Sequence, residues 1–408
     1  MNPVINPFSP GAGAPPPELV GRENILEEAK ILLGRIRLRR SVQGCMLTGL
    51  RGVGKTVLLS EVKRMAYAES VIPIAVEATA DKPIGALLAA PLKKALFELD
   101  RMEGAKEKVK KGIVALKNFI GTIKIDIGDI GIGIEPQHGF ADSGDLEYDL
   151  GELFACVAEA AAEKQRGVVL LIDEIQYLPE KELGALIMAM HRMQQDLLPL
   201  AAVGAGLPFL PGLAGNAKSY AERLFRFPDV GALSEEESAQ AIRKPMETAG
   251  VHIEDDAAHS VYEATRGYPY FLQEWGYQLW NHVQREPITI QDVEAVRSKV
   301  QERLDGSFFR VRIERLTKSE KDFLFAMAHV ETPEIKISDV ARIMNNPVAS
   351  LSPRRSSLIR KGMVYSPSHG EIAFTVPMFG EYLNRVRYFC SRGLKTKSEF
   401  QSRYVLWK

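Results

Sequence analysis

The sequence predicts an α/β protein built on a parallel β-sheet, followed by an all-helical segment and a smaller C-terminal domain. Two apolar runs indicate the sheet, because residues 45–47 and 167–172 resemble strands that are buried on both faces. A helical pattern at residues 57–68 follows the first run, as in a strand–turn–helix unit. From residue 234 to 304 the pattern indicates helices alone, and it gives no strand signal.

A glycine-rich stretch joins the first strand to its helix. Residues 49–56 read Gly-Leu-Arg-Gly-Val-Gly-Lys-Thr and fit the phosphate-binding pattern G-x-x-x-x-G-K-[ST] at every fixed position. In such a loop the backbone amides and the helix N-terminus attract the anion. We expect Lys55 to reach the β- and γ-phosphates and the Thr56 hydroxyl to bind Mg²⁺. The residues expected around the phosphates are Gly49, Gly52, Val53, Gly54, Lys55, Thr56 and Val57.

The second apolar run ends in two carboxylates, Asp173 and Glu174. Ligands of open α/β sheets bind at the carboxyl ends of the strands, so both side chains are expected beside the phosphate loop. Asp173 would hold the Mg²⁺ shell, and Glu174 would polarise the attacking water. The guanine-reading pattern Asn-Lys-x-Asp is absent from the sequence, which favours ATP over GTP. Together the motifs predict a nucleoside triphosphate hydrolase that uses ATP and Mg²⁺.

Composition is that of a soluble globular protein with room for two or three domains. The 408 residues are 46% hydrophobic and 25% charged, with 52 basic and 52 acidic side chains. No apolar run approaches a membrane span and no secretory signal is evident, so the sequence predicts a cytoplasmic protein without a membrane partner. The 3 cysteines and 7 histidines show no disulfide framework or zinc-ligand spacing.

A Val-Gly-Arg-Glu stretch at residues 20–23 precedes the phosphate loop by about thirty positions. With the two nucleotide motifs, it resembles AAA+ ATPases, in particular the subgroup of origin-recognition initiators and the signalling ATPases called STAND. The resemblance implies a P-loop NTPase fold of AAA+ type with a helical lid and a C-terminal winged helix-turn-helix, and it places Gly21 and Arg22 on the adenine side. The domains it implies are a Pro/Gly-rich arm at 1–18, the ATPase domain at 19–232, the lid at 233–305, the winged helix at 306–392 and a basic tail at 393–408.

An insertion is expected at about residues 100–145, because 118 positions separate Lys55 from Asp173, more than in the AAA+ pattern. Isoleucines alternate with other residues on both sides of the Gly128-Asp129 turn, which predicts a hairpin. The insertion either faces a partner or docks on its own domain, and we favour docking.

Three arginines are candidates for contact with the γ-phosphate. Arg223 and Arg226 lie where AAA+ families often present an arginine finger to the neighbouring subunit, and a surface ion pair is the equal alternative. Arg266, in a Thr-Arg-Gly-Tyr-Pro stretch that resembles the STAND Gly-x-Pro element, is the expected lid contact. Its alternative is a basic residue at a helix end. A further strand is expected at residues 199–206. It ends in Val203-Gly204-Ala205-Gly206 and lacks the polar sensor residue usual in AAA+ proteins, which favours the STAND side.

The C-terminal region is basic. Residues 341–408 hold twelve Lys and Arg against three acids, which suggests an anionic partner. Three helical patterns and a hairpin follow the order of a winged helix-turn-helix. Its third helix would contact DNA phosphates through Arg354, Arg355, Arg360 and Lys361. A solvated basic face is the alternative, and winged helices of STAND proteins often hold the ATPase closed instead.

Two functions therefore remain open. The first is an ATP-driven switch or oligomer that acts on double-stranded DNA in replication, transposition or defence against mobile elements. The second is a STAND-type signalling ATPase with slow turnover whose winged helix binds a protein. A P-loop kinase is disfavoured, because no substrate-side acid or kinase lid motif is evident.

Overall fold

The computed structural model describes residues 2–11, 13–101, 106–122, 141–283, 285–330, 332 and 335–391. Contacts divide the chain into two compact units. The first to be considered, the sheet unit, comprises residues 21–49 and 54–231. The other, the helical unit, comprises residues 1–20, residues 50–53 and the chain from residue 232 onward. The expected hairpin at residues 123–134 and the basic tail lie outside the described residues.

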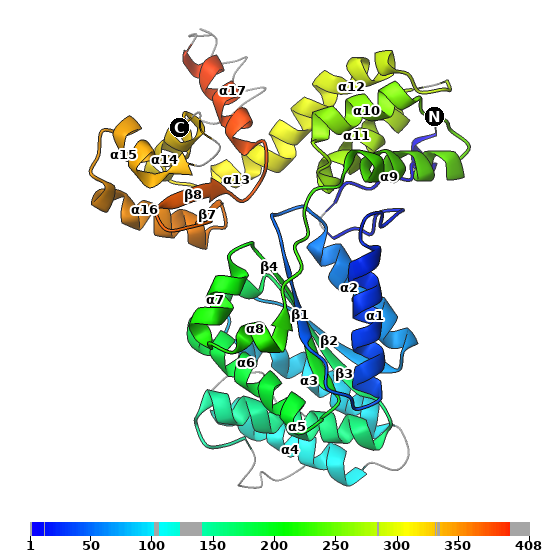
Figure 1. Cartoon of the computed structure of the whole chain (residues 1–408), viewed down its shortest axis with the longest axis vertical. Coiled ribbons are helices and arrows are strands. Elements are labelled where there is room, and N and C mark those ends of the chain that lie inside the picture. Colours follow the sequence, from blue (N-terminus) through cyan, green and yellow to red (C-terminus); the bar gives the residue numbers. More distant parts are fainter. Residues whose placement is uncertain are drawn as a thin grey trace. The chain divides into compact units, whose positions relative to one another are not determined.

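The sheet unit is built on five parallel strands in the order β2-β3-β4-β1-β5 (Figure 1). Both predicted apolar runs are strands, and β3 is buried from its first residue to Ile172. In register, Thr48 lies opposite Gly206 and Glu77 opposite Asp173, so the carboxyl ends meet at one edge. The strands are β1 (Gly44–Thr48), β2 (Val71–Glu77), β3 (Gly167–Asp173), β4 (Leu200–Gly206) and β5 (Phe225–Arg226).

Two groups of helices cover the sheet. Helices α1 and α2 pack against each other and on strands of the sheet, while α3, α5 and α6 form the second group (Figure 1). The central strands are thereby buried on both faces, which explains their apolar runs. The helices are α1 (Glu23–Arg37), α2 (Lys55–Ala68), α3 (Ile84–Asp100), α4 (Lys106–Thr122), α5 (Leu146–Glu163), α6 (Glu180–Gln195), α7 (Leu210–Ala217) and α8 (Ala221–Leu224), with a short 3₁₀ helix η2 (Ile175–Tyr177).

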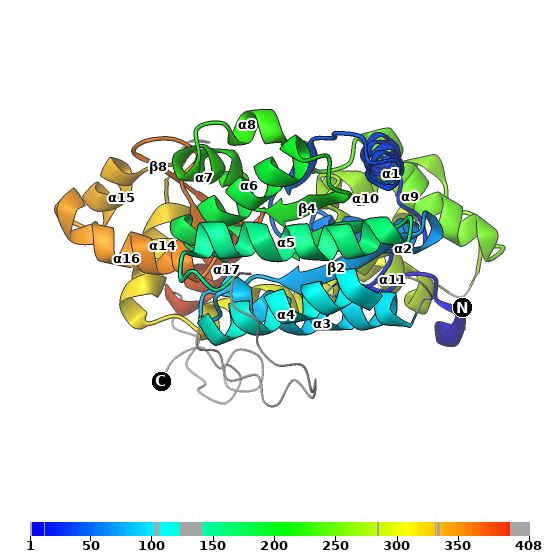
Figure 2. The same cartoon turned by 90° about the horizontal axis from the view of Figure 1, so that it is seen from below.

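Helix α4 is the described part of the expected insertion, and it docks on its own unit. It lies alongside α3 and α5 (Figure 2). Its apolar face, including Leu116 and Phe119, is buried in the core that also holds α5 and β3. For this helix, docking on the sheet unit is therefore observed.

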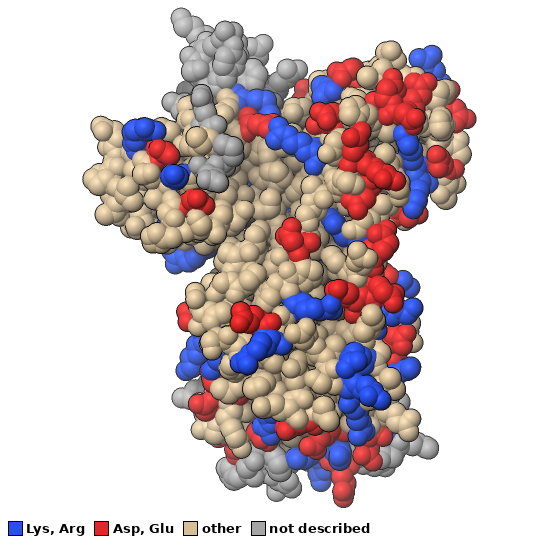
Figure 3. Space-filling model, viewed as in Figure 1, with Lys and Arg blue, Asp and Glu red and all other residues tan. Residues whose placement is uncertain are grey.

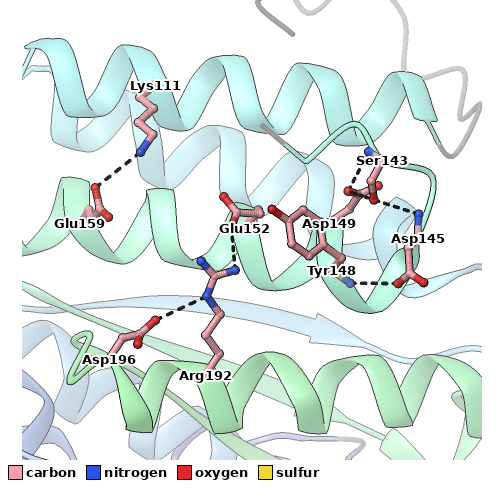
Figure 4. A network of polar contacts seen from close by, with 9 residues as sticks. All are labelled: Lys111, Ser143, Asp145, Tyr148, Asp149, Glu152, Glu159, Arg192 and Asp196. Carbon is pink, nitrogen blue, oxygen red and sulfur yellow. Dashed lines mark hydrogen bonds and ion pairs between the residues drawn. The ribbon is translucent and has the colours of Figure 1, made fainter. Parts of the chain in front are cut away.

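Charged side chains tie α4 and α6 to α5 (Figure 4). Lys111 on α4 lies 4.0 Å from Glu159, and Arg192 on α6 pairs with Glu152 at 2.7 Å. At the start of α5, buried Asp149 accepts hydrogen bonds from the Ser143 and Gly144 amides, both at 3.0 Å. These contacts hold α5 between α4 and α6 (Figure 4).

The helical unit contains four helices in succession, here called the four-helix segment: α9 (Glu235–Thr248), α10 (Asp255–Thr265), α11 (Pro269–His282) and α12 (Ile290–Arg303). As predicted, Ser234 and Glu237 form a capping box that begins α9. A π-helical turn, η3 (Leu304–Phe309), and α13 (Arg310–Glu314) lead out of the segment. Aromatic rings of Phe308, Phe309 and Tyr382 pack together where this turn meets α17.

The C-terminal part has four described helices and a three-stranded antiparallel sheet in the order β6-β8-β7. Three of these helices and the hairpin follow one another in the predicted order, whereas strand β6 was not predicted. It pairs with the hairpin through Ile335 and Ile372. The elements are α14 (Lys318–Ala328), β6 (Ile335–Lys336), α15 (Ile337–Ile343), α16 (Val348–Arg360), β7 (Val364–Tyr365), β8 (Glu371–Phe374) and α17 (Phe379–Ser391).

Prolines and glycines favour an N-terminal arm without regular structure, yet the start of the arm is ordered. Residues Pro3–Ile5 form a 3₁₀ turn, η1, and Phe8 is buried against α11 at Gly276. Asn6 donates a hydrogen bond to the Tyr277 carbonyl at 3.1 Å, and the Trp280 indole donates to the Asn2 carbonyl at 2.8 Å. Prolines and glycines prevent long helices, but one aromatic side chain is enough to anchor such a segment.

Candidate nucleotide site

The predicted phosphate loop lies between β1 and α2. The Gly49 amide donates to the Gly206 carbonyl at 3.2 Å, which ties the start of the loop to the end of β4. Gly52 and Gly54 have φ values of +87° and +99°, a conformation that favours glycine over any residue with a Cβ. Helix α2 begins at Lys55, so its N-terminal amides and the positive end of its dipole lie at the loop.

Lys55 is buried, with 8% of its surface exposed. Its Nζ donates to the Gly49 carbonyl at 2.8 Å, so the side chain reaches back across its own loop. A buried ammonium group is stable only where acceptors or anions surround it. The location of this cation at the phosphate loop fits a polyphosphate ligand.

Thr56 and Asp173 come together as predicted. The Thr56 hydroxyl donates to Asp173 Oδ2 at 2.6 Å, and Asp173 Oδ1 accepts from the Glu174 amide at 2.8 Å. The phosphate loop and the end of β3 thus present a hydroxyl and a carboxylate oxygen side by side. Oxygen donors of this kind are those that Mg²⁺ prefers, so the residues fit the ion.

Glu174 has a left-handed backbone conformation, with φ of +51°. Such a conformation is unfavourable for a residue with a side chain and persists where surrounding contacts impose it. The carboxylate accepts a hydrogen bond from the side-chain amide of Gln176, whose oxygen accepts from the Leu207 amide at 3.2 Å. Gln176 was not predicted. The sequence does place a polar residue two positions after Glu174, and this was the signal that could have identified Gln176.

Gly21 and Arg22 lie near the same end of the sheet. Residues 228–231 run beside the end of β1, because the Thr48 amide donates to the Pro228 carbonyl at 3.0 Å and the Val230 amide donates to the Thr48 carbonyl at 2.6 Å. The Arg22 guanidinium donates to the Gly21 carbonyl at 3.3 Å and to the Gly231 carbonyl at 2.5 Å. Arg22 therefore holds the start of α1 beside the strand that leads into the phosphate loop. Its contact with the adenine stays a prediction.

The two candidate arginine fingers differ in their surroundings. Arg226 on β5 pairs with Glu28 of α1 at 2.7 Å, which is the ion-pair alternative. Arg223 is exposed on α8. The geometry thus favours Arg223 over Arg226 for contact with another subunit, and the finger itself stays a prediction.

Arg266 ends α10 with a φ of +51°, and its guanidinium pairs with Glu381 of α17 at 2.8 Å. Arg266 is thus a basic residue at a helix end, which is the alternative that the sequence left open for it. Contact with a γ-phosphate stays a prediction for Arg266.

The four basic residues predicted for DNA contact also differ. Arg355 donates to the Ser366 hydroxyl and, at 3.4 Å, to the Glu371 carbonyl, so it faces the β7–β8 hairpin. Lys361 pairs with buried Glu320 at 2.8 Å. Arg354 is half-buried, whereas Arg360 is exposed at the end of α16. Two of the four cations therefore already hold the C-terminal domain together.

The geometry defines a P-loop nucleotide-binding protein, and comparison with known families narrows the class. Residues 18–203 match the family described as AAA ATPase domain. The chain therefore carries an AAA+ ATPase domain, and the protein is an ATP-hydrolysing P-loop enzyme. Residues 306–383 match a family described as a domain of unknown function. No curated protein matches the sequence.

Among solved structures, the chain is similar to the Walker-type ATPase PABY2304 of Pyrococcus abyssi, with 16% identity and a TM-score of 0.53 over 90% of this chain and 96% of the other. At this identity the likeness supports the fold alone. The RuvB Holliday junction branch migration motor of Thermotoga maritima has 17% identity and a TM-score of 0.44 over 90% and 95% of the two chains. Cdc6p from Pyrobaculum aerophilum has 17% identity and a TM-score of 0.45 over 97% and 99%. Neither of these two scores supports an argument about this chain. Among the described residues, no helix is long and apolar enough to cross a membrane.

Proposed function

We propose that the protein is a Mg²⁺-dependent ATPase that works as a nucleotide-driven switch or oligomer on double-stranded DNA. Lys55 binds the β- and γ-phosphates, and Thr56 and Asp173 hold the ion, which when bound neutralises phosphate charge. Glu174 orients and polarises the attacking water. The convergence of Thr56, Asp173 and Glu174 at one strand end is the observation that supports this chemistry.

Oligomers of this protein would complete the site with an arginine from the next subunit. Exposed Arg223 is the candidate, because Arg226 already neutralises Glu28. A cation at the γ-phosphate stabilises charge in the transition state. Arg223→Ala should then lower turnover while nucleotide binding by the isolated chain persists. If Arg223→Ala hydrolyses ATP as fast as the unaltered protein at every protein concentration, Arg223 is not the arginine finger.

DNA binding is proposed for the C-terminal domain. This proposal is based on charge, because the chain from residue 341 onward holds twelve basic residues and three acids. Acidic side chains gather instead on the four-helix segment (Figure 3), where the first turns of α9 and α10 contribute Glu235, Glu236, Asp255 and Asp256. That surface repels phosphates, so the C-terminal domain is the better partner for DNA. Its order of helix, strand, two helices and hairpin fits a winged helix, with exposed Arg360 at the end of the third helix.

Salt-dependent DNA binding tests this part of the proposal. We expect retention of double-stranded DNA that falls steeply with salt, because phosphate contacts release counterions. Arg360→Glu should weaken it, whereas Lys30→Glu, at an exposed lysine of α1, should not. DNA should also stimulate ATP hydrolysis at low salt. Absence of binding at low salt would overturn the assignment of DNA as partner.

A protein partner is the second candidate, and it has its own support. Arg355 and Lys361 are engaged inside the C-terminal domain, while Ile343 and Val348 are 41% and 45% exposed near the junction of α15 and α16. Exposed apolar side chains suit protein contacts better than phosphates. Slow hydrolysis that ignores DNA, together with loss of a protein complex in Ile343→Ser, would favour this signalling function.

A further inference from the structure

The end of strand β4 lacks the polar side chain expected beside a γ-phosphate. All seven residues of β4 are buried, and the sequence from Leu200 to Gly206 contains only apolar residues and glycine. A different element supplies a polar group at this place. Gln176 of η2 lies between the end of β3 and the end of β4.

The orientation of the Gln176 amide follows from its two partners. The Leu207 N–H can only donate, so it must face the amide oxygen, at 3.2 Å. The Glu174 carboxylate can only accept, so it faces the amide NH₂ group. Each partner alone would select the same orientation, and together they fix the side chain.

Gly206 leaves the space that Gln176 occupies. A Cβ built at Gly206 would lie 2.8 Å from Gln176 Oε1 and 2.9 Å from Leu210 Cδ2, closer than such atoms approach. A side chain at residue 206 would therefore crowd the ends of the Gln176 and Leu210 side chains, which would have to shift to admit it. Glycine at the end of β4 thus leaves room for the Gln176 contact.

A single peptide unit joins this bridge to the phosphate loop. The carbonyl of Gly206 accepts from the Gly49 amide at 3.2 Å, and the N–H of the same peptide, on Leu207, donates to Gln176. A chain of hydrogen bonds thus runs from the first residue of the phosphate loop through the Gly206–Leu207 peptide and Gln176 to the carboxylate of Glu174. Displacement of the loop would move the carboxylate.

We infer that Gln176 is a positioning residue for ATP hydrolysis, which orients the carboxylate of Glu174 and couples it to the phosphate loop in place of a sensor side chain on β4. This inference rests on the proposed role of Glu174 toward the attacking water. Gln176 itself acts through Glu174. A base that is misplaced by about an ångström loses up to about a hundredfold in rate, so a group that fixes its position is worth a measurable factor.

The test compares turnover and nucleotide binding in Gln176→Ala and a matched control. Gln176→Ala should lower kcat about tenfold to a hundredfold and leave KM for ATP within about twofold, because the phosphate contacts remain. Gln194→Ala is the control, since the half-buried Gln194 side chain also hydrogen-bonds to the backbone, donating to the Val42 carbonyl at 2.7 Å, at a place away from Glu174. The control should keep the kcat of the unaltered protein, and all variants should be matched by thermal melting.

Gln176→Glu adds a readout that a structural role would not move. The isosteric carboxylate retains an acceptor for the Leu207 amide but places a second negative charge against Glu174. Repulsion between the two carboxylates should displace Glu174, so kcat should fall at least as far as in Gln176→Ala while KM for ATP stays within about twofold. A kcat equal to that of the unaltered protein would contradict contact between the two side chains in the active enzyme.

The variant Glu174→Gln separates the possible failures. If Glu174→Gln abolishes turnover while Gln176→Ala keeps the kcat of the unaltered protein, the inference about Gln176 is overturned and the role of Glu174 stands. If Glu174→Gln hydrolyses ATP as fast as the unaltered protein, the proposed role of Glu174 and the inference about Gln176 are both overturned. In the Glu174→Gln background, Gln176→Ala should have no further effect on the residual rate, because the group it positions is gone.

Discussion

Asp173 connects the two parts of the nucleotide site through one carboxylate. One oxygen accepts from the Thr56 hydroxyl of α2, and the other accepts from the amide of Glu174. Both oxygens of its side chain are therefore held by protein donors. Groups fixed in this way hold an ion without a cost for reorganisation.

Replacement of this carboxylate should expose the dependence on metal. Asp173→Asn retains the size of the side chain but removes the charge that attracts Mg²⁺. We expect hydrolysis at fixed Mg²⁺ to fall at least about a hundredfold, with a higher Mg²⁺ concentration for half-maximal rate. Titration of MgCl₂ at saturating ATP measures both quantities.

Asp100→Asn, at the exposed end of α3, is the control and should behave as the unaltered protein. Thr56→Ser keeps the hydroxyl and should retain most activity. An Asp173→Asn variant with the same Mg²⁺ dependence as the unaltered protein would contradict the assignment of Asp173 to the metal.

Helix α14 is held in the C-terminal domain by its capping residue. Glu320 closes the capping box with Thr317 and also accepts from Ser357 at 2.7 Å and pairs with Lys361 at 2.8 Å. Burial would raise the pKa of the Glu320 carboxyl, but the hydrogen bonds from Lys361, Ser357 and Thr317 outweigh it and lower the pKa from 4.5 to about 2. One carboxylate thus joins α14 to the end of α16.

This pKa predicts how stability depends on pH. A carboxyl with a depressed folded-state pKa stabilises the fold above its unfolded value of 4.5, and the contribution disappears as the pH falls toward 2. We expect Glu320→Gln to lower the free energy of unfolding by up to about 3 kcal/mol at pH 7 and by much less near pH 2. Thermal melting across this range measures the difference.

The matched control is Asp322→Asn, at an exposed acid of the same helix. It should change stability by less than about 0.5 kcal/mol at either pH. A constant difference between Glu320→Gln and the unaltered protein from pH 7 to 2 would show that the charge of Glu320 does not stabilise the domain.

The N-terminal arm is anchored to α11 by Phe8, which is 2% exposed. Phe8→Ala should destabilise the contact by about 3 kcal/mol, because it removes a buried ring and leaves a cavity. The arm should then be cleaved faster in limited proteolysis. Val4→Ala, at a residue 89% exposed, should leave cleavage unchanged. Equal cleavage of both variants would argue against the docked arm.

For the whole chain, the sequence predicted what depends on local spacing. The phosphate loop at residues 49–56, the buried strand ending in Asp173 and the capping box of α9 are each encoded within a few consecutive residues. Contiguous patterns of this kind determine local structure directly. ATP hydrolysis followed from the two nucleotide motifs, and the AAA+ fold followed from the resemblance that these motifs carry together with residues 20–23. The family match of residues 18–203 confirms both.

Contacts between distant residues were not predictable in the same way. Phe8 packs on Gly276, Arg226 pairs with Glu28, and Gln176 reaches Leu207 across the gap between two strands. For Arg226, the sequence left two alternatives open, an arginine finger and an ion pair, and it did not identify Glu28 as the partner. Each of these contacts is set by tertiary packing, so no spacing rule in the sequence identifies the partner. For the same reason, the basic residues of α16 could not be separated into those that face solvent and those that hold the domain together.

The most direct test of the account measures ATP binding and single-turnover hydrolysis by the unaltered protein, Lys55→Ala and Glu174→Gln. Lys55→Ala should lose nucleotide binding, because the buried cation inside the loop is gone. Glu174→Gln should bind ATP as the unaltered protein does and hydrolyse it at least about a hundredfold more slowly, since it lacks the carboxylate that we propose as the group that polarises water. Unchanged hydrolysis in both variants would contradict the assignment of this site.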